Sequence, residues 1–329
     1  MTRVLWFDGP RAVAVRPQPP RPVEDGEARV RTTFSGISGG TEMLAYRGEL
    51  DPAVPVDETI GALGGTFSYP FQYGYSCVGT VEESRCELDE GAAVFAFQPH
   101  QDSFVARGSD LVVVGSVEPR QATLFPLVET ALQITLDAGA HVRETIVVLG
   151  LGAVGALTSL LMQRAGAHVV AVEPRAWRRA AANDLGVTAV GPDDVPSTLR
   201  ADGRPGLVTL VIDAAGSPEA LRGALSLLAH EGTVLVASWY GTKEVTLPLG
   251  AEFHRRPLTI RSTQVSTIPA HLASRWNHDT RRRAVVELLS ELPLDRLATH
   301  TFPFEQAGDA YAAIDAGTEG LIHAALGYR

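Results

Sequence analysis

A glycine-rich turn is the part of this sequence whose residue types and spacing are best suited to chemistry. Residues 150–155 read Gly-Leu-Gly-Ala-Val-Gly and directly follow the apolar run 146–149. In such a turn the first glycine permits a tight bend, the second lets the backbone approach a pyrophosphate, and the third allows close packing of a helix on a strand. Free N–H groups at the start of the next helix would face the phosphates. The pattern predicts a dinucleotide site formed by Gly150, Gly152, Ala153, Val154 and Gly155.

An acid follows at the end of the next expected strand. Glu173 ends the apolar run 168–172, about twenty residues after the turn, where a carboxylate binds ribose hydroxyls and repels a 2′-phosphate. Arg175 and Arg178 come soon after it and can bind such a phosphate. The sequence therefore predicts a nicotinamide dinucleotide, NAD(H) by preference with NADP(H) as the alternative, held in part by Glu173, Arg175 and Arg178.

The composition excludes several classes of protein. The 329 residues carry a net charge of −10, so no basic field is available to bind nucleic acid. Two cysteines are too few for a disulfide framework or a four-thiolate zinc lobe. The uncharged run 145–162 is interrupted by glycines, which argues against a membrane span. The N-terminus has no long apolar stretch, so we expect a cytoplasmic enzyme without a signal peptide.

Short β-like runs and turn signals dominate the first third of the chain. Residues 29–34, 77–83 and 92–97 have the composition of strands, with glycine and proline between them. This pattern favours a barrel-like, mostly antiparallel domain.

From residue 121 onward, strands and helices alternate. We expect strands at 145–149, 168–173, 207–212 and 233–237, and helices at 153–165, 175–185, 218–228 and 281–289. Such alternation is typical of a doubly wound parallel sheet. The expected domains are 1–120 with 265–329, and 121–264. The Arg281-Arg282-Arg283 run is interpreted as exposed.

The chain resembles the medium-chain dehydrogenases/reductases over nearly its whole length, in segment order and in residues 211–221 and 232–237. This resemblance implies an α/β fold with a doubly wound Rossmann domain and a GroES-like, mostly antiparallel β-barrel catalytic domain. It further implies that loops carrying Ala215, Ser238, Trp239 and Tyr240 line the nicotinamide side of the cofactor site. Thr130 is predicted to contribute there as well.

Within that superfamily the sequence is similar to the zinc-free branch that contains bacteriochlorophyllide a dehydrogenase. The likeness rests on residues 37–42, 74–76, 98–100, 238–241 and 275–276. Zinc-containing members carry a cysteine where this chain has Ser38, and a Gly-His-Glu triplet where it has Gly74-Tyr75-Ser76. Their third ligand falls near Pro126, which cannot bind a metal. We therefore expect no zinc.

Without zinc, the reaction needs another proton donor or oxyanion stabiliser. The resemblance places Ser38, Thr41 and Tyr75 near the nicotinamide, although Tyr75 could instead be a buried tyrosine with a satisfied hydroxyl. His100 could act as a general acid or simply pack in its loop. Glu42 and Glu129 are further candidates, and Glu129 could equally belong to a structural salt bridge.

The function expected is a zinc-independent NAD(P)-dependent oxidoreductase that moves hydride to or from a ketone/alcohol group of a specialised metabolite. The alternatives are a reductase of an activated C=C or C=N bond and a non-catalytic dinucleotide-binding protein. A small-molecule substrate is expected, with no nucleic-acid or membrane partner. The resemblance also implies a homodimer that pairs near residues 258–262.

Overall fold

The computed structural model describes residues 1–201 and 206–329 and divides the chain into two compact units. Unit 1 consists of Met1–Pro126 and Arg282–Arg329, and unit 2 consists of Leu127–Arg281. The expected domains had boundaries at 120/121 and 264/265. Two helices run across the observed boundaries, α3 (Phe125–Ala138) and α8 (His278–Glu291). Among the described residues, no helix is both long and apolar enough to cross a membrane.

Unit 2 contains a six-stranded sheet whose strand pairs are all parallel. Its order is β11-β10-β9-β12-β13-β14, so the chain starts at β9, adds two strands on one side, and then returns to the other side. Ligands of doubly wound sheets bind at the carboxyl ends of the strands where this reversal occurs, here between β9 and β12. The strands are β9 (Thr145–Leu149), β10 (His168–Val172), β11 (Thr188–Val190), β12 (Val208–Asp213), β13 (Leu228–Val236) and β14 (Thr259–Ser262).

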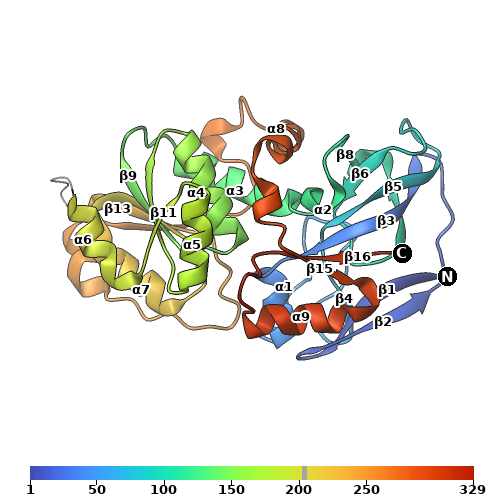
Figure 1. The fold of residues 1–329 in the computed structure, drawn as a ribbon, viewed down its shortest axis with the longest axis horizontal. Helices are drawn as coiled ribbons and strands as arrows, with labels where there is room; N and C mark the ends of the chain where they lie inside the picture. Colours follow the sequence, from blue (N-terminus) through green and yellow to red (C-terminus); the bar gives the residue numbers. More distant parts are fainter. Residues whose placement is uncertain (202–205) are drawn as a thin grey trace. The chain divides into compact units, whose positions relative to one another are not determined.

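The apolar composition of these strands explains the architecture. Four of the five β9 residues are buried, and β10 is buried after its first residue, as expected for strands covered on both faces. Helices α4 (Ala153–Arg164) and α5 (Ala176–Asp184) connect β9, β10 and β11, and α7 (Pro218–Leu227) connects β12 and β13 (Figure 1). The short helix α6 (Val195–Arg200) follows β11.

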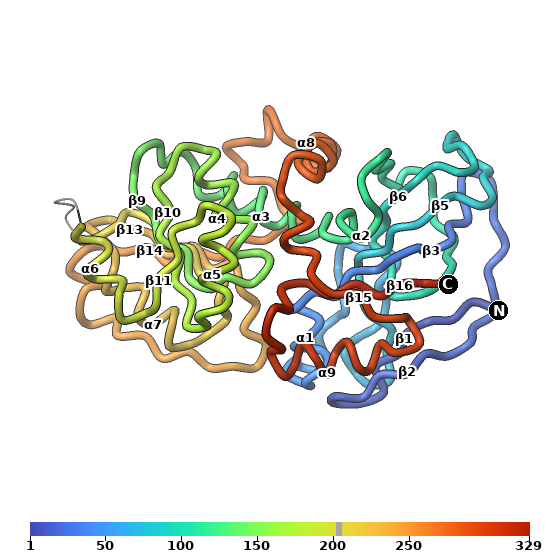
Figure 2. Tube along the Cα trace, in the orientation of Figure 1, coloured from blue at the N-terminus to red at the C-terminus, as the bar shows by residue number. Residues whose placement is uncertain are grey.

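Unit 1 contains two sheets that are mostly antiparallel. The smaller sheet has the order β2-β1-β4, and the larger has the order β15-β16-β3-β5-β6-β8 with β7 paired to β3. Figure 2 follows the N-terminal and C-terminal segments into this unit, where β16 pairs with β3. The strands are β1 (Thr2–Gly9), β2 (Ala12–Gln18), β3 (Glu27–Ile37), β4 (Phe71–Gln72), β5 (Cys77–Ser84), β6 (Ala93–Ala96), β7 (Ser103–Arg107), β8 (Val112–Val113), β15 (His300–Pro303) and β16 (Ala324–Gly327).

The three helices of unit 1 that matter here are α1 (Thr41–Arg47), α2 (Pro119–Ala122) and α9 (Ala307–Ala316). An aromatic and aliphatic core joins α1 and α9 to the small sheet, with Phe7, Phe71 and Tyr311 at its centre. Burial of such large side chains supplies most of the stabilisation of a unit of this kind.

Within the described residues, the mostly antiparallel strands expected in unit 1 are present and form two open sheets, not a closed barrel. Two expectations about local structure were wrong. The strand expected at 29–34 extends to Ile37, because Ser35–Ile37 pair with β16 and Ser35 also pairs with β5. Arg281 is only 2% exposed, because α8 begins at His278 and turns this side chain inward.

Candidate active site

Two of the three glycines of the 150–155 turn are required by their surroundings in the protein. Gly150 has a φ of 89°, and a Cβ there would lie 2.8 Å from the backbone oxygen of Ala214. A Cβ at Gly155 would lie 1.9 Å from the Gly150 oxygen, so any side chain would separate α4 from β9. A Cβ at Gly152 would meet no atom within 4 Å. The turn therefore packs tightly on the protein side and is open at the residue that must approach a pyrophosphate.

Glu173 follows β10 and ties its carboxylate to this turn. Its Oε2 accepts a hydrogen bond from the Leu151 N–H at 3.0 Å, and its Oε1 accepts one from the Arg175 N–H, also at 3.0 Å. The residue is 3% exposed. Each carboxylate oxygen can accept a second hydrogen bond, so the group can still bind ribose hydroxyls.

The arginines near Glu173 differ in their burial and in the hydrogen bonds that they already make. Nη1 of Arg178 lies 3.7 Å from Glu173 Oε2, and its Nε is buried with no hydrogen-bond partner within the described part of the chain. Burial lowers the pKa of Arg178, and the neighbouring Glu173 charge opposes this. Arg179 uses its Nη1 on the Glu173 and Pro174 carbonyl oxygens, whereas Arg175 is exposed. The unsatisfied Arg178 Nε fits a site that still lacks a polar ligand.

The loops expected to line the nicotinamide side are organised by an acid that the sequence analysis did not single out. Asp213 ends β12 and is fully buried; its Oδ1 accepts the Ala215 N–H at 3.0 Å and its Oδ2 accepts the Tyr240 hydroxyl at 2.7 Å. Burial raises the pKa of Asp213. Ser238 Oγ donates to the Asp213 carbonyl, and Trp239 is 44% exposed. An acid directly after an apolar strand, the signal used for Glu173, would also have identified Asp213.

In unit 1, three of the predicted catalytic residues come together. Ser38 lies in the bend after β3, and Thr41 begins α1. Burial raises the pKa of Tyr75 well above its ordinary value, with a further contribution from the charge of Glu42, and the nearby Ser38 and Thr41 hydroxyls partly oppose this rise. The phenol therefore keeps its proton at neutral pH and can donate it to an acceptor.

Glu42 and His100 form a second, fully buried group beside them. Glu42 Oε1 accepts the Ser38 N–H at 2.8 Å, and His100 Nε2 lies 2.9 Å from Glu42 Oε2. The same Oε2 accepts the Tyr311 hydroxyl, and His100 Nδ1 lies 2.7 Å from Ser35 Oγ. Sequence reasoning missed Ser35 and Tyr311; Tyr311 lies 269 residues from Glu42 along the chain and belongs to no local motif.

Glu129 belongs to unit 2 and lies on α3. Its Oε1 accepts a hydrogen bond from Arg281 Nε at 3.1 Å, and the two side chains are 4% and 3% exposed. Thr130 follows it on the same helix and is partly buried. Of the two interpretations considered for Glu129, this arrangement matches the buried salt bridge.

The positions that hold zinc in the related enzymes carry no metal-binding set here. Ser38 and Tyr75 offer only hydroxyl groups at these positions, and Ser76 Oγ donates to the Thr123 carbonyl oxygen at 2.7 Å. Throughout residues 1–201 and 206–329, no three His, Cys, Asp or Glu side chains are grouped so that they could hold a metal ion. The residues present therefore do not fit zinc.

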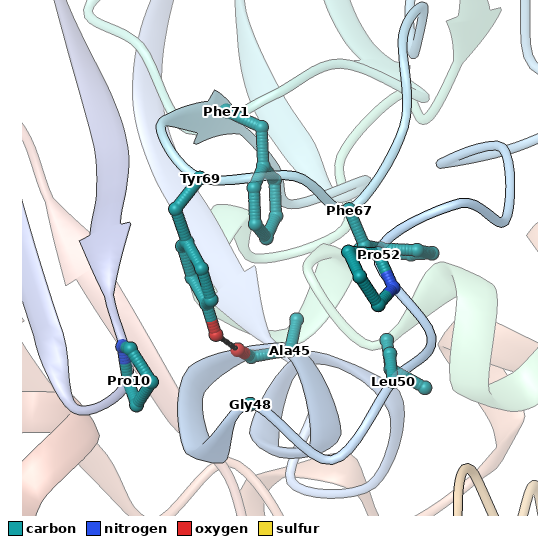
Figure 3. Close-up of a pocket in the computed structure, with 8 residues that line it drawn as sticks. All are labelled: Pro10, Ala45, Gly48, Leu50, Pro52, Phe67, Tyr69 and Phe71. Atoms are coloured by element: carbon teal, nitrogen blue, oxygen red, sulfur yellow. Dashed lines mark hydrogen bonds between the residues drawn. The ribbon is translucent and has the colours of Figure 1, made fainter.

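A small cavity of about 190 Å³ lies at the other end of α1 (Figure 3). Its lining is mainly apolar and includes Leu50, Phe67 and Phe71. The Tyr69 hydroxyl in its wall already donates to the Ala45 carbonyl oxygen. The cavity thus supplies no free group for acid–base chemistry.

The buried residue His323 leads to a prediction about the stability of the protein at acid pH. It is buried against Thr123 Oγ1, and desolvation lowers its pKa to about 4. As the pH falls from about 6.5 to about 4, the unfolded chain binds a proton at this residue and the folded chain does not, so the free energy of unfolding falls by about 3 kcal/mol. Urea unfolding at pH 7, 5.5 and 4 should show that His323→Gln removes about this much of the pH dependence.

Exposed His254 offers the matched control for this measurement. His254→Gln should leave the pH dependence of the wild-type chain unchanged. Parallel stability curves for the wild-type chain and His323→Gln would contradict the prediction.

The family comparison matches residues 153–287 to the zinc-binding dehydrogenase domain. D-guloside 3-dehydrogenase of Escherichia coli (strain K12) is 24% identical over 310 residues, covering 87% of each chain. The 2-desacetyl-2-hydroxyethyl bacteriochlorophyllide A dehydrogenase of Cereibacter sphaeroides is 26% identical over 332 residues, covering 94% of this chain and 93% of its own. A crystal structure of an Escherichia coli CFT073 alcohol dehydrogenase, described as short chain and complexed with NADH, superposes with a TM-score of 0.78 at 17% identity, covering 99% of both chains.

These similarities agree with the glycine turn, the acid after β10 and the order of the two units. The shared fold confirms the expected combination of a Rossmann domain with a GroES-like domain. The named relatives are dehydrogenases, as the sequence predicted for this chain. Residues 153–287 thus match a zinc-binding dehydrogenase domain, and over most of its length the chain resembles dehydrogenases of the medium-chain type.

Proposed function

We propose that this enzyme is a zinc-independent, NAD(H)-preferring oxidoreductase that interconverts a ketone and a secondary alcohol of a specialised metabolite. The observation that carries the proposal is that the Ser38 and Thr41 hydroxyls lie near enough to the Tyr75 phenol to lower its pKa, with Ser38 and Tyr75 standing where zinc-containing relatives carry metal ligands. The glycine turn, Glu173 and the unsatisfied Arg178 Nε support a dinucleotide in unit 2. The similar alcohol dehydrogenase structure that contains NADH supports the same cofactor.

When bound, the nicotinamide would supply or accept the hydride. The task of the protein is then to stabilise charge on the substrate oxygen. The Tyr75 phenol can donate a hydrogen bond to that oxygen. The Ser38 and Thr41 hydroxyls lower the pKa of the phenol, so they would stabilise the charge that develops there if the proton moves to the substrate. Hydroxyl groups thereby take over the role that a Lewis acid plays elsewhere.

The substrate class follows from the relatives and from the site. The two curated relatives are named as dehydrogenases of a guloside and of a hydroxyethyl-bearing bacteriochlorophyllide, which favours hydroxyl groups on larger molecules. Reduction of an activated C=C or C=N bond is the alternative, because it needs less stabilisation of an oxyanion. A non-catalytic dinucleotide-binding role is less well supported, since the hydroxyl groups at Ser38, Thr41 and Tyr75 are arranged as a connected set.

The test is turnover with a defined panel of compounds. Purified protein would be incubated with NADH and cyclic, glycosidic and tetrapyrrole ketones, with and without a metal chelator. Consumption of NADH that persists in the chelator supports the proposal. Activity that the chelator removes and Zn²⁺ restores would refute zinc independence, and NADH binding without any turnover would favour the non-catalytic role.

Glu173 is expected to decide the choice between the two cofactors. Glu173→Gln removes the charge that repels a 2′-phosphate and weakens the acceptor for the ribose hydroxyls, while Arg178 remains. The ratio of NADPH affinity to NADH affinity should rise by about tenfold or more, the value of one charge-assisted hydrogen bond. Cofactor fluorescence titrations measure both affinities.

Asp193→Asn, an exposed change in the same unit, is the control and should leave the ratio unaltered. Tighter binding of NADPH than of NADH by the wild-type chain would contradict the assignment and show that Arg175 and Arg178 dominate.

We also propose that the enzyme forms a homodimer through β14. This strand lies at one edge of the unit 2 sheet, and three of its four residues are exposed. An exposed edge offers unpaired backbone groups to a second copy. Light scattering on a sizing column measures the assembly, and a monomer at micromolar concentration would refute it.

A further inference from the structure

The carboxylate of Glu42 is the meeting point of three segments of unit 1 that are distant in sequence. It is fully buried and accepts hydrogen bonds from the Ser38 N–H at 2.8 Å and the Tyr311 hydroxyl at 2.5 Å. His100 Nε2 lies 2.9 Å from its Oε2. These partners come from the bend before α1, from α9 and from the loop between β6 and β7. A buried carboxylate with this many partners rigidifies the segments that supply them.

His100 connects the same group to the segment that carries Tyr75. Its backbone N–H donates to the Tyr73 carbonyl oxygen at 3.2 Å. Gly74 has a φ of 103°, and a Cβ there would lie 2.4 Å from His100 Cδ2, so the imidazole packs directly against the residue before Tyr75. The Ser35 hydroxyl holds the other ring nitrogen at 2.7 Å and lies 2.7 Å from the Tyr328 hydroxyl. The ring is therefore fixed on both sides.

Burial and connectivity argue against direct proton transfer from this group to substrate. Glu42, His100 and Tyr311 are each 0% exposed, so none can touch a ligand in this conformation. The link from Glu42 to Ser38 is a backbone amide, which does not carry protons between side chains. What the group can do is hold the Ser38–Thr41 bend and the Tyr73–Tyr75 segment at a fixed separation.

We propose that Glu42, His100 and Tyr311 form a positioning clamp that holds the Ser38–Thr41 bend at a fixed place beside the Tyr73–Tyr75 segment, a role that rests on the proposed function. In zinc-containing relatives, metal coordination would tie these two segments together. Here the buried, hydrogen-bonded carboxylate of Glu42 takes the place of that metal coordination. All four residues, Tyr311, Ser35, Glu42 and His100, are thus positioning residues. They act through the hydroxyl groups of Ser38, Thr41 and Tyr75.

Tyr311→Phe removes one hydrogen bond from the clamp and keeps the ring that packs on Phe7 and Tyr46. Amide hydrogen exchange of the cofactor-free full chain, read by mass spectrometry over peptides spanning 35–44 and 70–77, should be about tenfold faster than in the wild type, the effect of one charge-assisted hydrogen bond. Where a substrate is turned over, kcat should fall by a similar factor and the NADH dissociation constant should stay the same. A general loss of stability would raise exchange throughout the unit and would not separate kcat from cofactor affinity.

Tyr46→Phe is the matched control, because Tyr46 stacks on Tyr311 with ring centroids 5.2 Å apart and lies outside the clamp. Glu42→Gln, which retains one acceptor but loses the charge, should increase exchange over both peptides more than Tyr311→Phe does. Exchange in Tyr311→Phe that equals the wild type and Tyr46→Phe would overturn the clamp. Because exchange needs no substrate, absence of turnover would count against the proposed function alone.

Discussion

Replacing Tyr75 by phenylalanine should lower kcat by about 10²–10³-fold, because loss of one preorganised donor to a developing oxyanion has a cost of this size. The expected loss is large because the proposed site contains no metal to share the charge. The phenol is also the point on which the Ser38 and Thr41 hydroxyls converge, so the variant disconnects both from the substrate oxygen. NADH affinity should not change, since Tyr75 belongs to unit 1 and the glycine turn to unit 2. Steady-state rates and NADH fluorescence titrations measure the two quantities.

Tyr73→Phe provides the control, because Tyr73 is a buried neighbour whose ring centroid lies 5.9 Å from that of Tyr75. Its loss should change the rate far less. Ser38→Ala and Thr41→Ala should each cost less than Tyr75→Phe, because each removes only one of the two hydroxyls that lower the pKa of the phenol. Wild-type rates in Tyr75→Phe would exclude the phenol as the group that replaces zinc.

The dinucleotide unit could be predicted in detail because its signals are local. The strand before the glycine turn ends at Leu149, where the apolar run ends, and the helix after it begins at Ala153 as expected. Steric demands of the turn act between residues a few positions apart, as the contact of Gly155 with Gly150 illustrates. Asp213 obeyed the same rule as Glu173 and could have been found by applying it to every strand.

Most residues of the candidate site in unit 1 could be predicted from the sequence, but the hydrogen bonds between them could not. The resemblance pointed to Ser38, Thr41 and Tyr75, and Glu42 and His100 were further candidates; the fold brings these five residues into two neighbouring groups. The contact with Tyr311 joins positions 269 residues apart, and nothing in the local sequence of either residue encodes it. Such long-range pairings arise from how the C-terminal helix packs on α1, which depends on the whole core.

The burial of Arg281 could have been predicted from the spacing of residues in its own helix, although the three consecutive arginines suggested an exposed segment. Arg281, Val285 and Leu289 are spaced four residues apart on α8 and are all buried, at 2%, 0% and 1% exposure. This spacing marks one face of a helix. Three adjacent arginines suggested a solvated segment, whereas the period of the helix places the first of them on the apolar face.

Breaking the Glu129–Arg281 pair should destabilise the protein by about 3–5 kcal/mol, because it leaves one uncompensated charge in the interior. The Arg281 guanidinium also donates to Gln133 Oε1 at 2.6 Å and to the Thr267 carbonyl oxygen at 3.3 Å, so it cannot swing out to water without losing these bonds as well. In Glu129→Leu the positive charge would remain buried, and in Arg281→Met the carboxylate would. Urea unfolding of the full chain measures the loss in each variant.

The double variant Glu129→Leu/Arg281→Met distinguishes loss of the pair from loss of packing. With both charges replaced by apolar groups, most of the stability should return, since the desolvation cost disappears together with the attraction. Arg283→Met changes an exposed arginine on the same helix and should stay within about 0.5 kcal/mol of the wild type. If the double variant were as unstable as the two single variants combined, the two residues would act independently, and the buried ion pair would not explain their effect. If both single variants matched Arg283→Met, the pair would contribute nothing to holding α3 against α8 in unit 2.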